Sequence, residues 1–230
     1  DEAAGLEGHP LLGFAQHFAE LGYVTLATDC IATGDRVSRG RAPFDTRASI
    51  KDYPDMSPLL KMVSDHMFAV DVLSELKSVD ASRVGVVGHG LGGCNALLLS
   101  AYDERVQACV ASCAFTRFED DEDVDTRWAC ETEYNLLPNF AKVMKAKKTY
   151  PFDWEHILAL IAPSPSLLIN AARPSNGSDP VSTEKAVAMA KNIYKLLAVP
   201  SALECFVHAG ERGMELESVA AADDWLARWL

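Results

Sequence analysis

The fold is decided by the stretch from Val84 to Gly93, which reads VGVVGHGLGG. Its valines predict a buried strand, and the glycines that follow them predict a tight turn. The apolar run from Ala96 to Leu99 then predicts a largely buried helix. A strand, a glycine-rich turn and a helix in this order are typical of an α/β protein with a parallel sheet.

The rest of the chain alternates in the same way between short β-branched runs and amphipathic stretches. We expect strands over residues 23–28, 83–87, 106–112, 166–171 and 202–207. We expect further helices over residues 11–21, 59–76, 181–197 and 215–230. The sequence shows no internal repeat or low-complexity tract, so we expect one α/β domain over residues 1–230.

Composition excludes several classes of partner. The 33 acidic and 21 basic residues give a formal net charge of −12, with a pI near 4.9. Such a charge disfavours nucleic acid and anionic membrane surfaces as partners. The longest apolar runs are far shorter than the roughly 20 residues that a membrane-spanning helix needs. We therefore expect neither nucleic acid nor a membrane as a partner.

No metal site is expected from the sequence. The six cysteines lie in apolar segments without CxxC pairs or histidine partners at zinc spacing, which predicts reduced thiols and a reducing, intracellular compartment. The acidic run within residues 118–128 lacks the Gly and Asn spacing of a calcium loop. We interpret it as a solvated loop whose like charges repel one another.

A dinucleotide cofactor is the alternative interpretation of the glycine-rich turn, because Gly88, Gly90 and Gly93 have the G-x-G-x-x-G spacing. Two features count against it. The turn comes in mid-chain, after one expected strand and two expected helices. About 20 residues further on, residues 109–111 read CVA where a ribose-binding acidic residue would stand. We therefore expect no cofactor.

The turn instead resembles the G-x-S-x-G nucleophile elbow of α/β-hydrolases. Its flanks resemble the acetyl xylan esterase and dienelactone hydrolase branch of that superfamily. Residues 22–36 look like the fourth strand of that branch and its following loop, and residues 152–165 look like the segment before its seventh strand. The resemblance implies a three-layer α/β-hydrolase fold with a mostly parallel sheet. It also implies that a side chain at Gly88 or Gly92 would collide where the helix meets the strand.

The resemblance assigns catalytic positions residue by residue. The nucleophile position falls on Gly90, and the next residue, Leu91, would supply the oxyanion amide beside His89. The acid position falls on Asp179, which could equally be the cap of the following helix. The base position falls on Arg212, within a segment similar to the H-x-G-G-H-G-F turn of the family.

Both reactive positions are therefore vacant. A glycine offers no nucleophile, and the guanidinium of Arg212 stays protonated. We expect a pseudo-hydrolase of the esterase branch, in which Gly90 leaves space and Arg212 could hold a small carboxylate or ester ligand. One alternative is an active carboxylic ester hydrolase, with Gly90 engineered or with Cys94 and His208 acting instead. Another is a structural subunit with apolar patches around residues 140–150.

The resemblance also implies a strand between those expected over residues 23–28 and 83–87. Residues 1–10 hold only one large aliphatic residue, Leu6, and cannot form it. We expect that the two flanking strands do not pair directly with each other. The sequence also begins without Met, so we expect the missing strand to come from residues upstream of Asp1 or from a separate polypeptide partner.

Overall fold

The centre of the fold is a parallel sheet of four strands in the order β1-β2-β3-β4. The computed structural model describes residues 8, 10–129, 135–140, 150–173, 177–210 and 213–230. The strands are β1 (Val84–His89), β2 (Val106–Ser112), β3 (Ser166–Ala171) and β4 (Leu203–His208). All three neighbouring pairs are parallel. Four of the five expected strands and the α/β class are thus confirmed.

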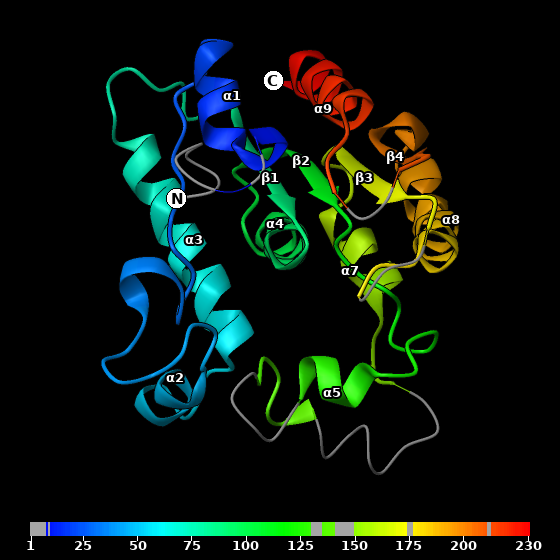
Figure 1. Ribbon diagram of the computed structural model, residues 1–230. Coiled ribbons are helices and arrows are strands. Elements are labelled where there is room, and N and C mark those ends of the chain that lie inside the picture. The colour runs from blue at the N-terminus through cyan, green and yellow to red at the C-terminus, as the bar shows by residue number, and fades with distance from the viewer. Residues whose placement is uncertain (1–7, 9, 130–134, 141–149, 174–176, 211–212) are drawn as a thin grey trace.

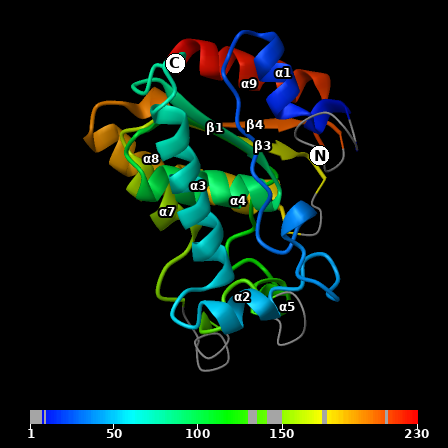
Figure 2. The same cartoon turned by 90° about the vertical axis from the view of Figure 1, so that its left-hand side faces the viewer.

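Helices cover both faces of this sheet (Figures 1 and 2). One face carries α3 (Pro58–Ser74), α4 (Leu91–Tyr102), α7 (Trp154–Ile161) and α8 (Pro180–Leu196), and the other carries α1 (Phe14–Glu20) and α9 (Leu216–Trp229). The short helices α2 (Arg47–Asp52) and α5 (Val124–Trp128) both lie beyond one end of the sheet. Single 3-10 turns span Pro10–Leu12, Gly34–Arg36 and Pro200–Ala202.

The two larger of three buried clusters lie on opposite faces of the sheet because side chains alternate along each strand. On β2, Cys109 and Ala111 belong to the core under α4, α7 and α8. Their neighbours Ala108 and Val110 belong to the core under α1 and α9. Both sets are almost fully buried, as expected for a parallel sheet with helices on each side.

The expectation of a buried strand over residues 23–28 is wrong. This segment forms no ladder, and Val24 and Leu26 are 47% and 45% exposed. Among the described residues, no backbone hydrogen bond joins the segment to β1. The two do not pair directly, as the resemblance implied. A β-branched run forms a strand only when a neighbouring strand satisfies its backbone groups, and no strand in the described part of the chain pairs with this one.

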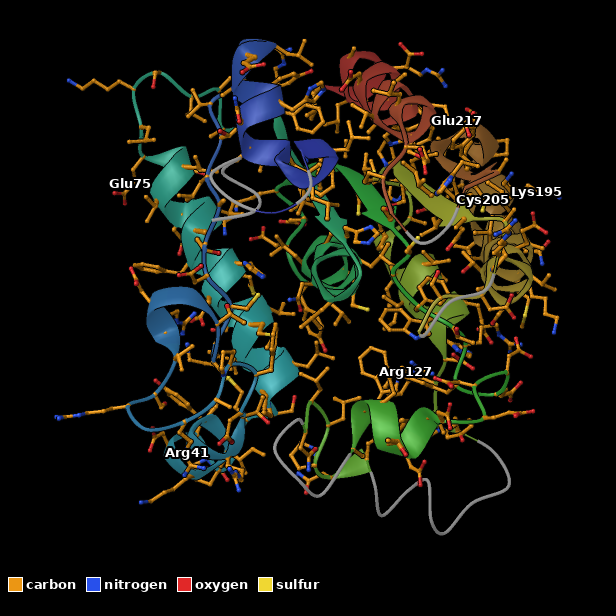
Figure 3. The ribbon with its side chains drawn as sticks, in the orientation of Figure 1. Arg41, Glu75, Arg127, Lys195, Cys205 and Glu217 are labelled. Carbon is orange, nitrogen blue, oxygen red and sulfur yellow. The ribbon has the colours of Figure 1, made fainter. Side chains whose placement is uncertain are left out.

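The acidic run is the exposed loop that was expected over much of its length, but its charges are compensated and do not simply repel one another. Arg117 lies 3.0 Å from a carboxylate oxygen of Glu119 and 3.2 Å from one of Asp120. Arg127, a residue of α5 that is labelled in Figure 3, lies 2.7 Å from a carboxylate oxygen of Asp121. The two arginines compensate much of the negative charge, so the run folds back on the protein and α5 forms within it.

An aromatic cluster accounts for the apolar residues that follow. Phe118 stands at its centre, 5.1 Å from Phe140 and 5.8 Å from Tyr150 between ring centroids. Phe140 is only 8% exposed, so it does not contribute to an outward apolar patch. The rest of the patch expected around residues 140–150 falls on residues 141–149, outside the described part of the chain.

Candidate functional site

The turn between β1 and α4 is built around Gly90, whose backbone angles are φ 56° and ψ −121°. L side chains rarely adopt a positive φ of this kind, so glycine fits the position best. The Gly90 N–H donates to the carbonyl of Ser112 at the end of β2 (2.8 Å). The carbonyl of Gly90 accepts from the N–H of Cys94 (3.1 Å), and this is the first hydrogen bond of α4. The turn is therefore fixed to the sheet on one side and to the helix on the other.

Two neighbouring glycines let the helix approach the strand. A Cβ at Gly88 would lie 2.1 Å from the carbonyl oxygen of Gly92, and a Cβ at Gly93 would lie 3.0 Å from the carbonyl oxygen of Ser112. The expected crowding at Gly88 is confirmed. At Gly92 the expectation is wrong, because a Cβ there would meet no atom within 4 Å. The backbone of Gly92, and not its Cβ position, is what contacts the strand.

The parallel strands end at one edge of the sheet, where binding sites of open α/β folds form. Gly90 follows β1 there, and β2 ends in the buried Ser112, whose Oγ lies 3.0 Å from Nδ1 of His89. Leu91 is the first residue of α4, so its N–H has no partner within the helix. The structure thus brings His89, Gly90 and Leu91 together around one hydroxyl-lined turn.

Asp179 lies two strands away from this turn, in the connection between β3 and α8. Its carboxylate accepts from the N–H of Val181 (3.0 Å), so Asp179 is the N-cap of α8. No hydrogen bond joins it to a histidine among the residues that the structure describes. The hydrogen bonding observed for Asp179 is that of a helix cap.

His208 ends β4, beside Ala171 of β3, and is 1% exposed. Its backbone carbonyl accepts from Ala172 N–H (2.8 Å), but neither ring nitrogen has a hydrogen-bond partner within the described ranges. Arg212, at the expected base position, lies outside those ranges, as does its neighbour Glu211. In the described residues, the structure does not bring Gly90, Asp179 and His208 into a hydrogen-bonded chain.

Three cysteines, Cys94, Cys109 and Cys205, are partly or fully buried. Cys94 is 2% exposed and its thiol donates to the carbonyl of Ala114 (2.7 Å). Burial raises the pKa of Cys109 to about 12 and that of Cys205 to about 11. Figure 3 places Cys205 beside α8, and β4 is the strand of the sheet furthest from β1. The thiolate is the reactive form of cysteine, so the raised pKa values disfavour nucleophilic chemistry at Cys109 and Cys205.

A buried ion pair that the sequence did not predict lies close to this edge. The Arg117 guanidinium donates to both carboxylate oxygens of Glu155, over 3.0 and 3.1 Å, and both side chains are 8% exposed. The Arg117 backbone N–H donates to the hydroxyl of Ser182 (2.9 Å). The pair joins the segment after β2 to α7 and α8. Arg117 and Glu155 are 38 residues apart, so no local pattern of residues predicts that they pair. The only signal in the sequence is the excess of negative charge in the acidic run, which favours a nearby cation.

Neither a metal site nor a membrane span is found in the described part of the chain. No group of three or more His, Cys, Asp or Glu residues there is placed to hold a metal ion. None of the helices described is both long and apolar enough to cross a bilayer.

Comparison with known families agrees with this fold. A family model described as "Dienelactone hydrolase family" matches residues 1–125, more than half of the chain. The chain is a member of the dienelactone hydrolase family of α/β-hydrolases. A second model, described as "Glucuronyl esterase, fungi", matches residues 66–198 of the same dienelactone hydrolase-family chain. The resemblance to this superfamily is confirmed.

Individual relatives cover most of the chain. "Putative hydrolase YtaP" of Bacillus subtilis is 27% identical over 184 residues, 74% of this chain and 54% of that protein. A glucuronoyl esterase from Solibacter usitatus shares the fold with a TM-score of 0.66 at 21% identity, covering 75% of this chain and 49% of the other. A glucuronoyl esterase from Caldicellulosiruptor kristjansonii also gives 0.66, at 19% identity, covering 85% and 57%. This dienelactone hydrolase-family chain thus spans about half the length of the relatives it matches.

Proposed function

We propose that this member of the dienelactone hydrolase family is a pseudo-hydrolase, which keeps an esterase fold without cleaving esters. The observation that carries the proposal is Gly90. It occupies the sharp strand-to-helix turn, at φ 56°, where the G-x-S-x-G motif places its nucleophile. A glycine at that point has no oxygen or sulfur atom to attack an ester carbonyl.

The groups around Gly90 support the same conclusion. The thiol of Cys94 is bonded to a backbone carbonyl, and the ring of His89 meets the hydroxyl of Ser112. By sequence, the base position holds Arg212, which cannot accept a proton. A nucleophile and its base act as a unit, so the loss of either removes most of the chemical rate enhancement.

We extend the proposal to a retained binding role. The Leu91 amide at the start of α4 has no partner within that helix, and the sequence places a cation at Arg212. Helix N-terminal amides and guanidinium groups both favour anionic oxygens. A small carboxylate, or an ester that is bound and not turned over, is the ligand class that these groups suit.

The test is hydrolysis of p-nitrophenyl acetate by the unaltered protein and by Gly90→Ser, Arg212→His and the double variant. Gly92→Ser is the matched control, because it adds a hydroxyl two residues away in open space. We expect no turnover by the unaltered protein or by the control. The double variant should exceed Gly90→Ser by about 100-fold or more, which is the usual contribution of a general base.

A fluorophosphonate probe gives a second readout for the same set. It should label the double variant and leave Gly92→Ser unlabelled, with folding of each variant checked by circular dichroism. Ester turnover by the unaltered protein, above that of a heat-unfolded sample, would overturn the proposal and return attention to Cys94 and His208.

A further inference from the structure

The outward face of α8 carries a row of exposed apolar side chains. Leu196 is 79% exposed, the largest fraction for any large apolar residue that the structure describes, and Met189 is 49% exposed. Leu160 of the neighbouring helix α7 is 68% exposed. The two helices are joined where the Tyr194 hydroxyl donates to the carbonyl of Ser164, just after α7 (3.1 Å). The exposed apolar residues of this face, here called the α8 patch, are Leu160, Val181, Met189, Ile193 and Leu196.

The α8 patch is large enough to form an interface. The 17 residues of α8 make a helix about 25 Å long, and a neighbouring helix such as α7 packs about 8–10 Å away. The face of the two helices therefore measures roughly 20 by 25 Å. Two such faces would bury about 1,000 Å² in total, which is the lower limit for a specific protein interface. This area suits a weak association that depends on protein concentration.

The α8 patch lies far from the part of the sheet where a strand is expected but not found. α8 packs against β3 and β4, and β4 is at the opposite end of the sheet from β1. Figure 1 shows α8 on one side of the molecule and α3, with residues 23–28, on the other. Polypeptide that completes the sheet beside β1 would therefore leave the patch uncovered.

Charged residues border the α8 patch along one flank of the helix. Glu184, Lys191 and Lys195 follow one another at spacings of seven and four residues, which places them on the same side of α8. Burial raises the pKa of Cys205 to about 11, and smaller contributions from Glu184 and Lys191 place this flank toward β4. In the described ranges no ion pair engages Glu184 or Lys195. Both charges are therefore available to a partner.

The residues of this face are arranged almost symmetrically about Met189. Val181 and Leu196 lie eight and seven positions from Met189, and Glu184 and Lys195 lie five and six positions from it. When two α8 helices pack antiparallel across a two-fold axis, equivalent flanks meet in opposite directions. Val181 of one copy then meets Leu196 of the other. Glu184 of each copy lies opposite Lys195 of the other, so the face is complementary to itself in charge.

We propose that two copies of this chain associate through their α8 patches, with the two α8 helices antiparallel about a two-fold axis at Met189. The remaining charge on this face, Lys185, is compensated by Asp120 of its own chain (3.1 Å). An acidic partner of another kind would suit the lysines but would face a like charge at Glu184, so a second copy fits better. The inference does not depend on the proposed function.

The first experiment is sedimentation equilibrium of the 230-residue protein between about 1 and 500 µM, the range of a weak interface. We expect a monomer–dimer equilibrium. Leu196→Asp should raise its dissociation constant about 100-fold or more, because each dimer loses two buried leucines and gains two buried charges. Leu216→Asp alters a similarly exposed leucine of α9, on the other face of the sheet, and should leave the constant unchanged. A protein that stays monomeric throughout would overturn the proposal.

Charge reversal tests the antiparallel arrangement. Glu184→Lys and Lys195→Glu should each raise the dissociation constant about 10-fold, because each brings like charges together at two symmetric places. The variant with both changes again has opposite charges at these places. Its dissociation constant should return to within about 3-fold of that of the unaltered protein. A double variant as weak as the single variants would refute the arrangement.

A further variant distinguishes the α8 patch from the open groove of about 420 Å³ between β1 and residues 23–28. Leu26→Lys places a charge on the groove wall and should leave the association unchanged. Association that Leu26→Lys abolishes and Leu196→Asp preserves would assign the contact to the groove and overturn the proposal.

Discussion

Gly88→Ala and Gly92→Ala should change stability in opposite directions, although the two residues lie only four positions apart. A Cβ at Gly88 would lie 2.1 Å from the oxygen and 2.3 Å from the carbon of the Gly92 carbonyl. Ordinary carbon contacts are about 3.5 Å, so α4 would have to retreat by roughly 1 Å or more. The obstacle is backbone, which no rotamer change relieves. We expect a loss near the upper end of the overpacking range, about 3 kcal/mol.

For Gly92→Ala we expect an increase in the free energy of unfolding instead of a loss. A Cβ there meets nothing within 4 Å, and the residue lies in the first turn of α4. Replacing a helical glycine by alanine without a clash should stabilise the protein by about 0.5–1 kcal/mol.

Urea unfolding followed by tryptophan fluorescence measures both variants on one scale. For a protein of this length, the loss at Gly88 corresponds to a fall in Tm of about 6–12 °C. The reasoning is refuted if Gly88→Ala unfolds at the same urea concentration as the unaltered protein. It is equally refuted if Gly92→Ala is destabilised to the same extent.

Two further predictions concern buried charges. Arg117→Ala leaves the Glu155 carboxylate buried without its two hydrogen bonds and should cost about 3–5 kcal/mol in urea unfolding; a loss below about 1 kcal/mol would contradict this. Hydrogen bonds from Arg47 and Arg41 hold the pKa of the Asp45 carboxyl well below its usual range. The ionised carboxylate therefore stabilises the folded protein above about pH 3.9, the pKa of an unfolded aspartate. This stabilisation is lost as the pH falls toward the pKa of the folded state. Asp45→Asn should therefore be less stable than the unaltered protein at pH 7, with a difference that narrows at pH 3; urea midpoints at both pH values measure it, and a constant difference would exclude this mechanism.

The features predicted correctly from the sequence are those that neighbouring residues specify. The strand at residues 84–89, its glycine turn and the apolar helix after it follow from β-branched residues, glycines and apolar periodicity within some 20 residues. The helix over residues 180–196 follows from Asp179 and Pro180 before an amphipathic run. Each of these signals is local, because capping and periodicity involve residues only a few positions apart.

The features predicted incorrectly depend on contacts between distant segments. Residues 23–28 have strand composition, but a strand needs a partner across the sheet, and sequence composition does not say whether one is present. The negative charge of the acidic run is partly compensated by Arg117, which also pairs with Glu155 of α7. Gly92 has the same side chain as Gly88, yet only the packing of α4 on β1 decides which of them is crowded.

The sequence by itself therefore determined the α/β class, the four strands and the glycine turn around Gly90. These depend on which residue stands where along the chain. Tertiary structure alone decided that Arg117 pairs with Glu155, that the thiol of Cys94 is bonded inside the core, and that β1 faces an open groove. Hydrogen-bond partners and burial arise from the approach of segments far apart in sequence, so no local pattern of residues encodes them.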